Sequence, residues 1–184
     1  MFKSDLCTSP AGSAALGKLS AALTEGVRTR HPVRIDVLNT SVLNAIALPG
    51  GQVFLFDGLL QRAEHVDEIA GVLGHEVGHE AAQDGLKGII RAGGTALFLG
   101  LLFGDVTGSW AVVAVTRQLI DSAHSRDAES QADAFGRALM HAHGRPASDM
   151  ARLLVRISGE EAGKGSIFAS HPMSKDRLEA LRRA

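Results

Sequence analysis

The chain has 184 residues, of which 45% are apolar and 21% charged, a composition typical of a globular domain rather than a disordered segment. Its 19 basic and 20 acidic side chains nearly balance, so we expect no nucleic-acid-binding surface. The single cysteine excludes an intrachain disulfide, and no apolar run is long enough to span a membrane. We therefore expect one soluble domain over residues 1–184, with residues 1–13 as a disordered or truncated start.

The first third of the chain predicts a helix followed by a small sheet. Apolar residues recur at helical spacing over Ala14–Val27. Val33–Leu38 alternates apolar and polar side chains, as a half-buried strand does. Asn44–Leu48 and Gln52–Phe56 flank Pro49-Gly50-Gly51, which predicts a hairpin because these residue types favour tight turns.

The rest of the chain predicts mainly helices. His65–Ala82 has a helical apolar pattern with acidic residues in its first turn, where the helix dipole favours them. Further helices are predicted over Ser125–His141, Ala147–Ile157 and Met173–Arg183. Residues 85–115 form an apolar, glycine-rich insertion, which fits either a lid over a cleft or a helical hairpin in the core. The predicted fold class is α+β, mainly helical with a sheet of about three strands.

The helix predicted over residues 65–82 contains the motif His75-Glu76-Val77-Gly78-His79. Residues four apart lie on one face of a helix, so both imidazoles can bind one metal ion. The carboxylate of Glu76 would then lie beside the ion, where it can take a proton from water. The motif therefore predicts a catalytic zinc site.

A catalytic zinc site needs a third protein ligand and one open position. The candidates are the acidic and histidine side chains His124, Asp127, Glu129, Asp133, His141, His143 and His171. Glu129 and Asp133 are four apart in one predicted helix, so one can bind the metal while the other orients a ligand histidine. The alternative is a pair of acids on a solvated helix face.

Four segments in this order resemble the HtpX-like and CAAX prenyl endopeptidase family of zinc metalloproteases. They are Asn44-Ala45 with Pro49-Gly50-Gly51, then His75 to His79, then Ser125 to Asp133, and finally His171-Pro172 with Arg177. The family consists of gluzincins, in which a glutamate is the third zinc ligand. The resemblance implies a minigluzincin-type zinc peptidase domain.

The resemblance also implies individual roles. Zinc would be bound by His75, His79 and Glu129, with Glu76 as the general base and Asp133 as a hydrogen-bond partner of a ligand histidine. His171 and Arg177 match residues at the mouth of the cleft. The edge strand on which an extended peptide substrate pairs would include Asn44, Ala45, Ile46 and Ala47.

The sequence departs from the family pattern in two places. Ser130-Gln131 replace residues that are often acidic, and Glu80 with the apolar insertion follows the motif where the family often has a short basic segment. The second departure leaves open how the cleft is covered.

The chain has no tyrosine, so no tyrosine hydroxyl can stabilise the charge that develops on the scissile carbonyl oxygen. His171 and Arg177 are the candidate donors for this role. The alternatives are a loop histidine bonded to a backbone carbonyl and an ordinary surface cation. The other histidines are expected at the surface or at helix ends: His31, His65, His124, His141 and His143.

These observations predict a zinc metalloendopeptidase with one Zn²⁺ per chain and an extended polypeptide substrate. A latent form is a variant of this prediction, with His171 in the fourth zinc position. Two other classes compete with it: a catalytically silent zinc-stabilised scaffold, and a membrane-surface module built on residues 95–115. Glu76 argues against the scaffold because a structural site needs no base. The few basic residues in 95–115 argue against the module, although a membrane-associated parent protein fits the sequence.

Overall fold

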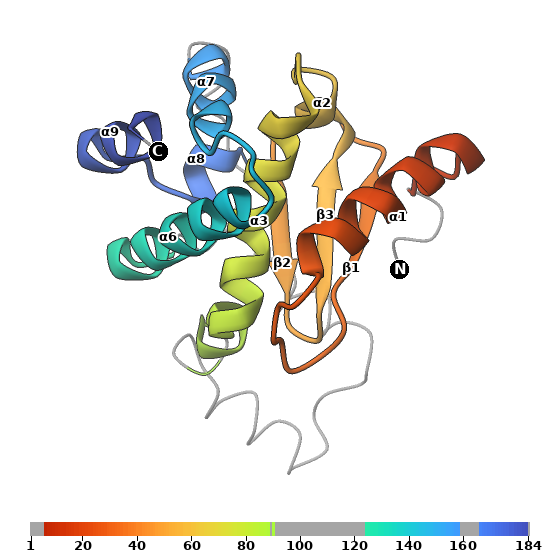
Figure 1. The fold of residues 1–184 in the computed structure, drawn as a ribbon, viewed down its shortest axis with the longest axis horizontal. Helices are drawn as coiled ribbons and strands as arrows, with labels where there is room; N and C mark the ends of the chain where they lie inside the picture. The colour runs from red at the N-terminus through yellow and green to blue at the C-terminus, as the bar shows by residue number, and fades with distance from the viewer. Residues whose placement is uncertain (1–5, 89, 91–123, 159–165, 184) are drawn as a thin grey trace, which may run out of the picture.

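The computed structural model describes residues 6–88, 90, 124–158 and 166–183 (Figure 1). Three strands are formed by Arg34–Leu38 (β1), Ala45–Leu48 (β2) and Gln52–Phe56 (β3). The helices are Pro10–Thr24 (α1), Asp57–Leu60 (α2), Val66–Ala82 (α3), Arg126–Ala142 (α6), Ser148–Ile157 (α7), Ile167–Ser170 (α8) and Lys175–Arg182 (α9). The predicted α+β class, mainly helical with a three-stranded sheet, is confirmed.

The sheet has the order β1-β3-β2, so β2 lies at an edge. β1 is parallel to β3, whereas β2 pairs antiparallel with β3 through the predicted hairpin. Gly50 and Gly51 both have positive φ in the turn, at 100° and 85°. A Cβ on Gly51 would lie 2.4 Å from the carbonyl oxygen of Pro32, so only glycine fits this turn.

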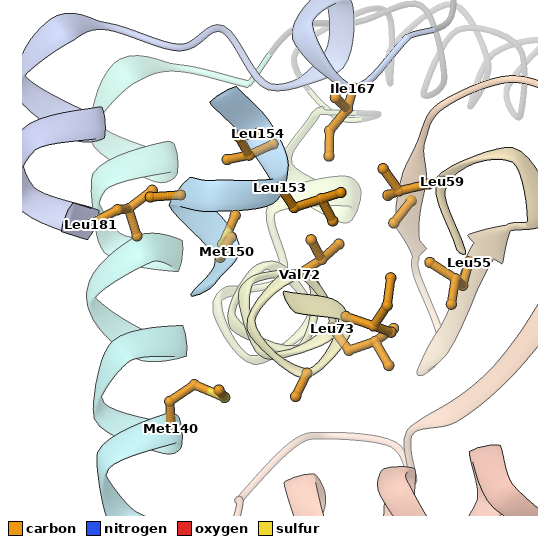
Figure 2. Close-up of a cluster of buried hydrophobic side chains, with 14 of the residues drawn as sticks. Leu55, Leu59, Val72, Leu73, Met140, Met150, Leu153, Leu154, Ile167 and Leu181 are labelled. Carbon is orange, nitrogen blue, oxygen red and sulfur yellow. The ribbon is translucent and has the colours of Figure 1, made fainter. Parts of the chain in front are cut away.

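Helix α3 is the centre of the fold (Figure 1). It lies between the sheet and the helices α6 and α7, and it packs most extensively against α6. Its apolar side chains Val72 and Leu73 are fully buried. Figure 2 shows these two residues between Leu153 of α7 and Leu55 of β3. Because this core fixes α3 on both sides, it also fixes the H-E-x-x-H motif.

The structure corrects the predicted start of the first helix. Helix α1 begins at Pro10 rather than Ala14, and it ends at Thr24 rather than Val27. The side chain of Ser9 accepts a hydrogen bond from the backbone N–H of Gly12, and Pro10 occupies the first helical position. Both are helix-start signals.

The other predicted helices agree with α3, α6, α7 and α9 to within two residues. The short helices α2 and α8 were not expected. Most of the apolar insertion, residues 91–115, lies outside the described residues, so its role as lid or hairpin stays a prediction. None of the helices in the described part of the chain is long and apolar enough to cross a membrane.

Candidate metal centre

The histidines of the motif meet Glu129 and His171 in the interior of the protein. His75 and His79 lie one turn apart on α3, Glu129 lies in the first turn of α6, and His171 follows α8 directly. One ligand atom from each of these four buried residues lies within 4.8 Å of those of the others. The structure therefore brings together the three predicted ligands and the predicted fourth one.

The outer nitrogens of both motif histidines face carboxylates. Nδ1 of His75 lies 2.9 Å from Oδ1 of Asp133, and Nδ1 of His79 lies 3.0 Å from Oδ2 of Asp84. With a proton on each Nδ1, both Nε2 atoms present lone pairs to each other at 3.1 Å. Two acceptors this close repel each other unless a cation lies between them. This arrangement fits a metal ion.

The charges around the cluster also favour a cation. Four buried carboxylates and one buried guanidinium surround it: Asp84, Glu76, Glu129, Asp133 and Arg177. Burial raises the pKa of Glu129, but hydrogen bonds with His171, His75 and His79 outweigh burial and hold that pKa far below its ordinary value. Glu129 is therefore a carboxylate at neutral pH and is available as a ligand.

Without a metal, protons supply part of the missing positive charge. Burial lowers the pKa of His79, but hydrogen bonds with Asp84 and Glu129 outweigh burial and raise it to about 9. Between pH 6.5 and about 9 the folded protein therefore binds a proton at His79 that the unfolded chain does not bind. Zinc binding must displace this proton.

We expect the free energy of unfolding of the metal-free protein to fall as the pH rises through this interval. The reason is that His79 has a higher pKa in the folded protein than in the unfolded chain. The resulting stabilisation is fully present below the pKa of the unfolded chain and is lost as the pH rises above the pKa of the folded protein. Urea unfolding in the presence of a chelator, at pH values from 6 to 9.5, measures the effect. His79→Gln removes the titrating group, so its stability should vary less over the same interval. An equal slope in both proteins would contradict the assignment.

Arg177 lies behind the ligands rather than at the mouth of a cleft. Its Nε and Nη2 donate to the two carboxylate oxygens of Asp133, at 2.7 and 2.8 Å. Its Nη1 lies 2.8 Å from Oε2 of Glu129 and donates to the backbone carbonyl of Pro172 at 2.7 Å. Burial lowers the pKa of Arg177, but Asp133 and Glu129 outweigh it and raise that pKa. The guanidinium thus holds two carboxylates in place.

Glu76 is buried beside the cluster, and its side chain has few contacts to polar groups. Neither carboxylate oxygen accepts a hydrogen bond from the described residues. Nε2 of His171 lies 3.4 Å from Oε1. A carboxylate that is not tied by hydrogen bonds and lies next to a metal centre can accept a proton from water.

The His171 segment is hydrogen-bonded to the residues that lead into the strand predicted to bind substrate. Its backbone N–H donates to Ile167 in α8, and Ile167 in turn donates to the carbonyl of Leu43 at 2.8 Å. The hydroxyl of Ser170 donates to Oδ1 of Asn44 at 3.3 Å. Asn44 is fully buried and precedes β2, whereas Ala45, Ile46 and Ala47 lie in the edge strand itself. The Asn44 side chain therefore holds the His171 segment rather than facing a peptide.

Sequence reasoning missed two members of the site. Asp84 reaches His79 because Gln83 adopts the left-handed conformation, with φ at 57°, and turns the chain back at the end of α3. His124 was expected at the surface or at a helix end, away from the metal; it does precede α6, but its ring stacks on that of His79 with centroids 4.1 Å apart. Burial and the neighbouring His79 and His171 lower the pKa of His124 to about 4.

Glycines let α3 and α6 approach closely enough to form the site. A Cβ on Gly136 of α6 would lie 3.1 Å from the backbone nitrogen of His75 and 3.3 Å from the carbonyl carbon of Gly74. A Cβ on Gly78 of α3 would lie 3.1 Å from Cα of Ala132. These contacts are with backbone atoms, so larger residues would force the helices apart.

We expect Gly136→Ala to lower the free energy of unfolding by about 1–3 kcal/mol and to weaken metal binding about tenfold, because the added methyl group displaces the backbone of His75. Gly17→Ala is the matched control, since a Cβ there meets nothing within 4 Å. That substitution should stabilise the protein by about 0.5–1 kcal/mol. Thermal unfolding and metal titration with a competing chelator measure both quantities. Equal effects of the two substitutions would contradict the close-packing argument.

Comparisons with known proteins agree with this geometry. Residues 19–184 match peptidase family M48. The chain is 32% identical over 152 residues to mitochondrial metalloendopeptidase OMA1 of Schizosaccharomyces pombe, covering 80% of this chain and 45% of that protein. It is 30% identical over 190 residues to metalloprotease YcaL of Escherichia coli, which covers 91% of this chain and 67% of that protein. It is 28% identical over 159 residues to metalloprotease LoiP of the same organism, which covers 83% of this chain and 62% of that protein. The chain thus spans less than half of the first relative and about two thirds of the other two.

Proposed function

Since the chain belongs to peptidase family M48, we propose that it is a zinc-dependent metalloendopeptidase whose Zn²⁺ is held by His75, His79 and Glu129. The observation that carries the proposal is the pair of Nε2 atoms 3.1 Å apart, with Oε1 of Glu129 3.3 Å from one of them. Two imidazoles and a carboxylate are a typical ligand set of catalytic zinc. One ion per chain follows from the single cluster found in the described residues.

Zinc bound there would supply a Lewis acid and lower the pKa of a water molecule to about 7. Glu76 is the residue that takes the proton of the attacking water and passes it to the nitrogen of the leaving peptide. Asp133 and Asp84 keep the protons of His75 and His79 on the outer nitrogens, so the inner nitrogens stay available. Arg177 balances part of the charge of the carboxylates.

The proposed substrate is an extended polypeptide that pairs with β2. This strand lies at an edge of the sheet and packs against α3, the helix that bears the motif. A peptide added to such an edge gains backbone hydrogen bonds regardless of its sequence. Its scissile bond would be presented to the neighbouring motif helix. Membrane proximity through residues 95–115 stays a prediction, since most of that segment lies outside the described residues.

The resting site is proposed to be latent, with His171 as a fourth zinc ligand. Nδ1 of His171 lies 3.1 Å from Oε1 of Glu129 and 3.3 Å from Nε2 of His75. A fourth protein ligand would close the position that water needs in a catalytic site. Activity would then require the segment that follows α8 to move.

His171→Ala is expected to keep about one zinc per chain but to replace one imidazole nitrogen by water in the coordination shell. X-ray absorption on the purified zinc protein measures the change. His141→Ala, at the exposed end of α6, is the control and should leave the spectrum unchanged. Turnover of a short peptide is the second readout, because opening the water position on zinc should raise the rate. An unchanged number of nitrogen ligands in the His171 variant would contradict latency.

The experiment that tests the function is hydrolysis of unfolded casein with the metal content measured in parallel. The zinc protein should cleave casein, lose activity with a chelator, and recover it when about one equivalent of Zn²⁺ is restored. Because a latent resting site lowers the rate, the His171 variant is assayed beside the natural sequence. The competing function is a zinc-stabilised scaffold. In that case zinc removal would unfold the protein while neither sequence cleaved casein.

A further inference from the structure

His124 lies against the metal cluster but is not one of the four grouped ligands. Its ring is nearly parallel to that of His79, with an interplanar angle of 15° and 4.1 Å between centroids. It also contacts the ring of His171, with centroids 5.4 Å apart. The backbone N–H of His124 donates to the carbonyl of Ser170 at 3.1 Å, which holds it beside the His171 segment.

The other candidate donors for the scissile carbonyl oxygen are occupied. Nε, Nη1 and Nη2 of Arg177 contact Asp133, Glu129 and the carbonyl of Pro172. Both ring nitrogens of His171 face carboxylates of the site, Glu129 and Glu76. The chain contains no tyrosine. Yet peptide hydrolysis builds negative charge on the carbonyl oxygen, and a positioned donor lowers that barrier.

We propose that His124 is a further catalytic residue, whose imidazole N–H donates a hydrogen bond to the carbonyl oxygen of the scissile peptide. This proposal rests on the proposed function. The His124 ring stacks on that of His79, one of the proposed zinc ligands, so its in-plane N–H groups lie at the level of the cluster's edge. His124 is half-buried, whereas His75, His79, Glu129 and His171 are buried, so a substrate can reach it.

The geometry also links this role to the departure of His171. The His171 ring contacts the rings of both His79 and His124, with centroids 5.2 and 5.4 Å away. When His171 moves away, His124 faces the space that the ring has left. The carbonyl oxygen of a substrate can enter that space. His124 keeps its proton in this step, and the proton transfers from water to the leaving nitrogen belong to Glu76.

A purely structural role for His124 predicts a different result. In that case the flat ring of His124 would only support the ring of His79, and a phenylalanine at position 124 would serve equally well. Glutamine, by contrast, retains an N–H donor but not the stacked ring. The substitutions His124→Phe and His124→Gln therefore separate hydrogen bonding from stacking. His141→Phe, at the exposed end of α6, is the control for introducing a phenylalanine.

The test uses the zinc-loaded chain and measures zinc content, kcat and KM for a short peptide, and the affinity for two inhibitors. One inhibitor is a phosphinic peptide, whose oxygens imitate the tetrahedral carbonyl. The other is a thiol peptide with the same side chains and no such oxygen. We expect H124F to keep its zinc and to lose about 10²-fold in kcat, with little change in KM. Its affinity for the phosphinic peptide should fall by a similar factor. Its affinity for the thiol peptide should be unchanged, and H124Q should recover part of the rate.

The proposal is overturned if H124F matches the natural sequence in kcat and in phosphinic-peptide affinity, or if its only defect is loss of zinc. An equal loss of affinity for both inhibitors also overturns it, because the thiol peptide has no oxygen in the position of the scissile carbonyl. The proposed function fails separately, if neither the natural chain nor its His171→Ala variant, both loaded with zinc, cleaves peptides faster than the Glu76→Gln variant. The affinity comparison still decides the role of His124 in that case.

Discussion

Peptide hydrolysis by the Glu76→Gln variant is expected to be about 10³-fold slower than by the natural sequence, while zinc stays bound at one ion per chain. The amide has nearly the shape of the carboxylate but cannot accept the proton of the attacking water. Glu76 is buried beside the cluster without a hydrogen-bond partner among the described residues, so the change breaks no hydrogen bond there. The loss should therefore appear in kcat and not in folding or metal content.

The measurement is single-turnover cleavage of a fluorogenic peptide with zinc determined on the same samples. Glu80→Gln is the matched control, because Glu80 is also buried on α3 but accepts a hydrogen bond from the backbone of Gly51 in the hairpin turn. That variant should retain the natural rate. A Glu76 variant that keeps its activity would show that the base is a different residue, and one that loses zinc would show that Glu76 supports metal binding instead.

The parts of the site that depend on local spacing were predictable from the sequence. His75 and His79 are one helical turn apart, so their convergence follows from helix geometry alone. The pairing of Glu129 with Asp133 follows from the same rule in α6. The resemblance to the HtpX-like and CAAX prenyl endopeptidase family supplied the choice of Glu129 over other acids, and the match to peptidase family M48 confirms that resemblance.

The parts that depend on long-range packing were not predictable in the same way. Arg177 meets Asp133 across 44 positions in the sequence, so its burial follows from how α9 packs and not from any local pattern. Asp84 requires a left-handed residue at Gln83, a conformation that glutamine rarely adopts. His124 lies just before α6, after a segment that the sequence did not place. Gly136 was not recognised as a packing residue because its partner atoms belong to α3.

For the fold, periodicity predicted the long helices and strands, and the chemistry of turns predicted the hairpin. The start of α1 was missed although Ser9 and Pro10 carry a recognisable helix-start signal. The short helices α2 and α8 contain four residues each, too few to show a periodic pattern. Yet His171 follows α8 directly, so a helix that the sequence did not predict positions the proposed fourth zinc ligand of the latent form.

The Glu129→Gln variant is expected to bind zinc more than about 100-fold more weakly than the natural sequence. A glutamine offers a neutral oxygen in place of a carboxylate, and it also leaves Nη1 of Arg177 beside a neutral group. Two buried imidazoles then face each other with less negative charge near them. The change therefore weakens one ligand and removes one of the four buried negative charges that attract a dication.

Competition with a chromogenic chelator measures the zinc affinity of this variant, and circular dichroism shows whether it still folds. The control is Asp127→Asn, which removes an acid from the same first turn of α6 at an exposed position. That variant should bind zinc as the natural sequence does, because Asp127 lies outside the cluster. Natural affinity in the Glu129 variant, together with loss of the ion in His171→Ala, would move the third ligand from Glu129 to His171. The opposite pair of results supports Glu129 as the third zinc ligand and His171 as the fourth one, which leaves when the site opens.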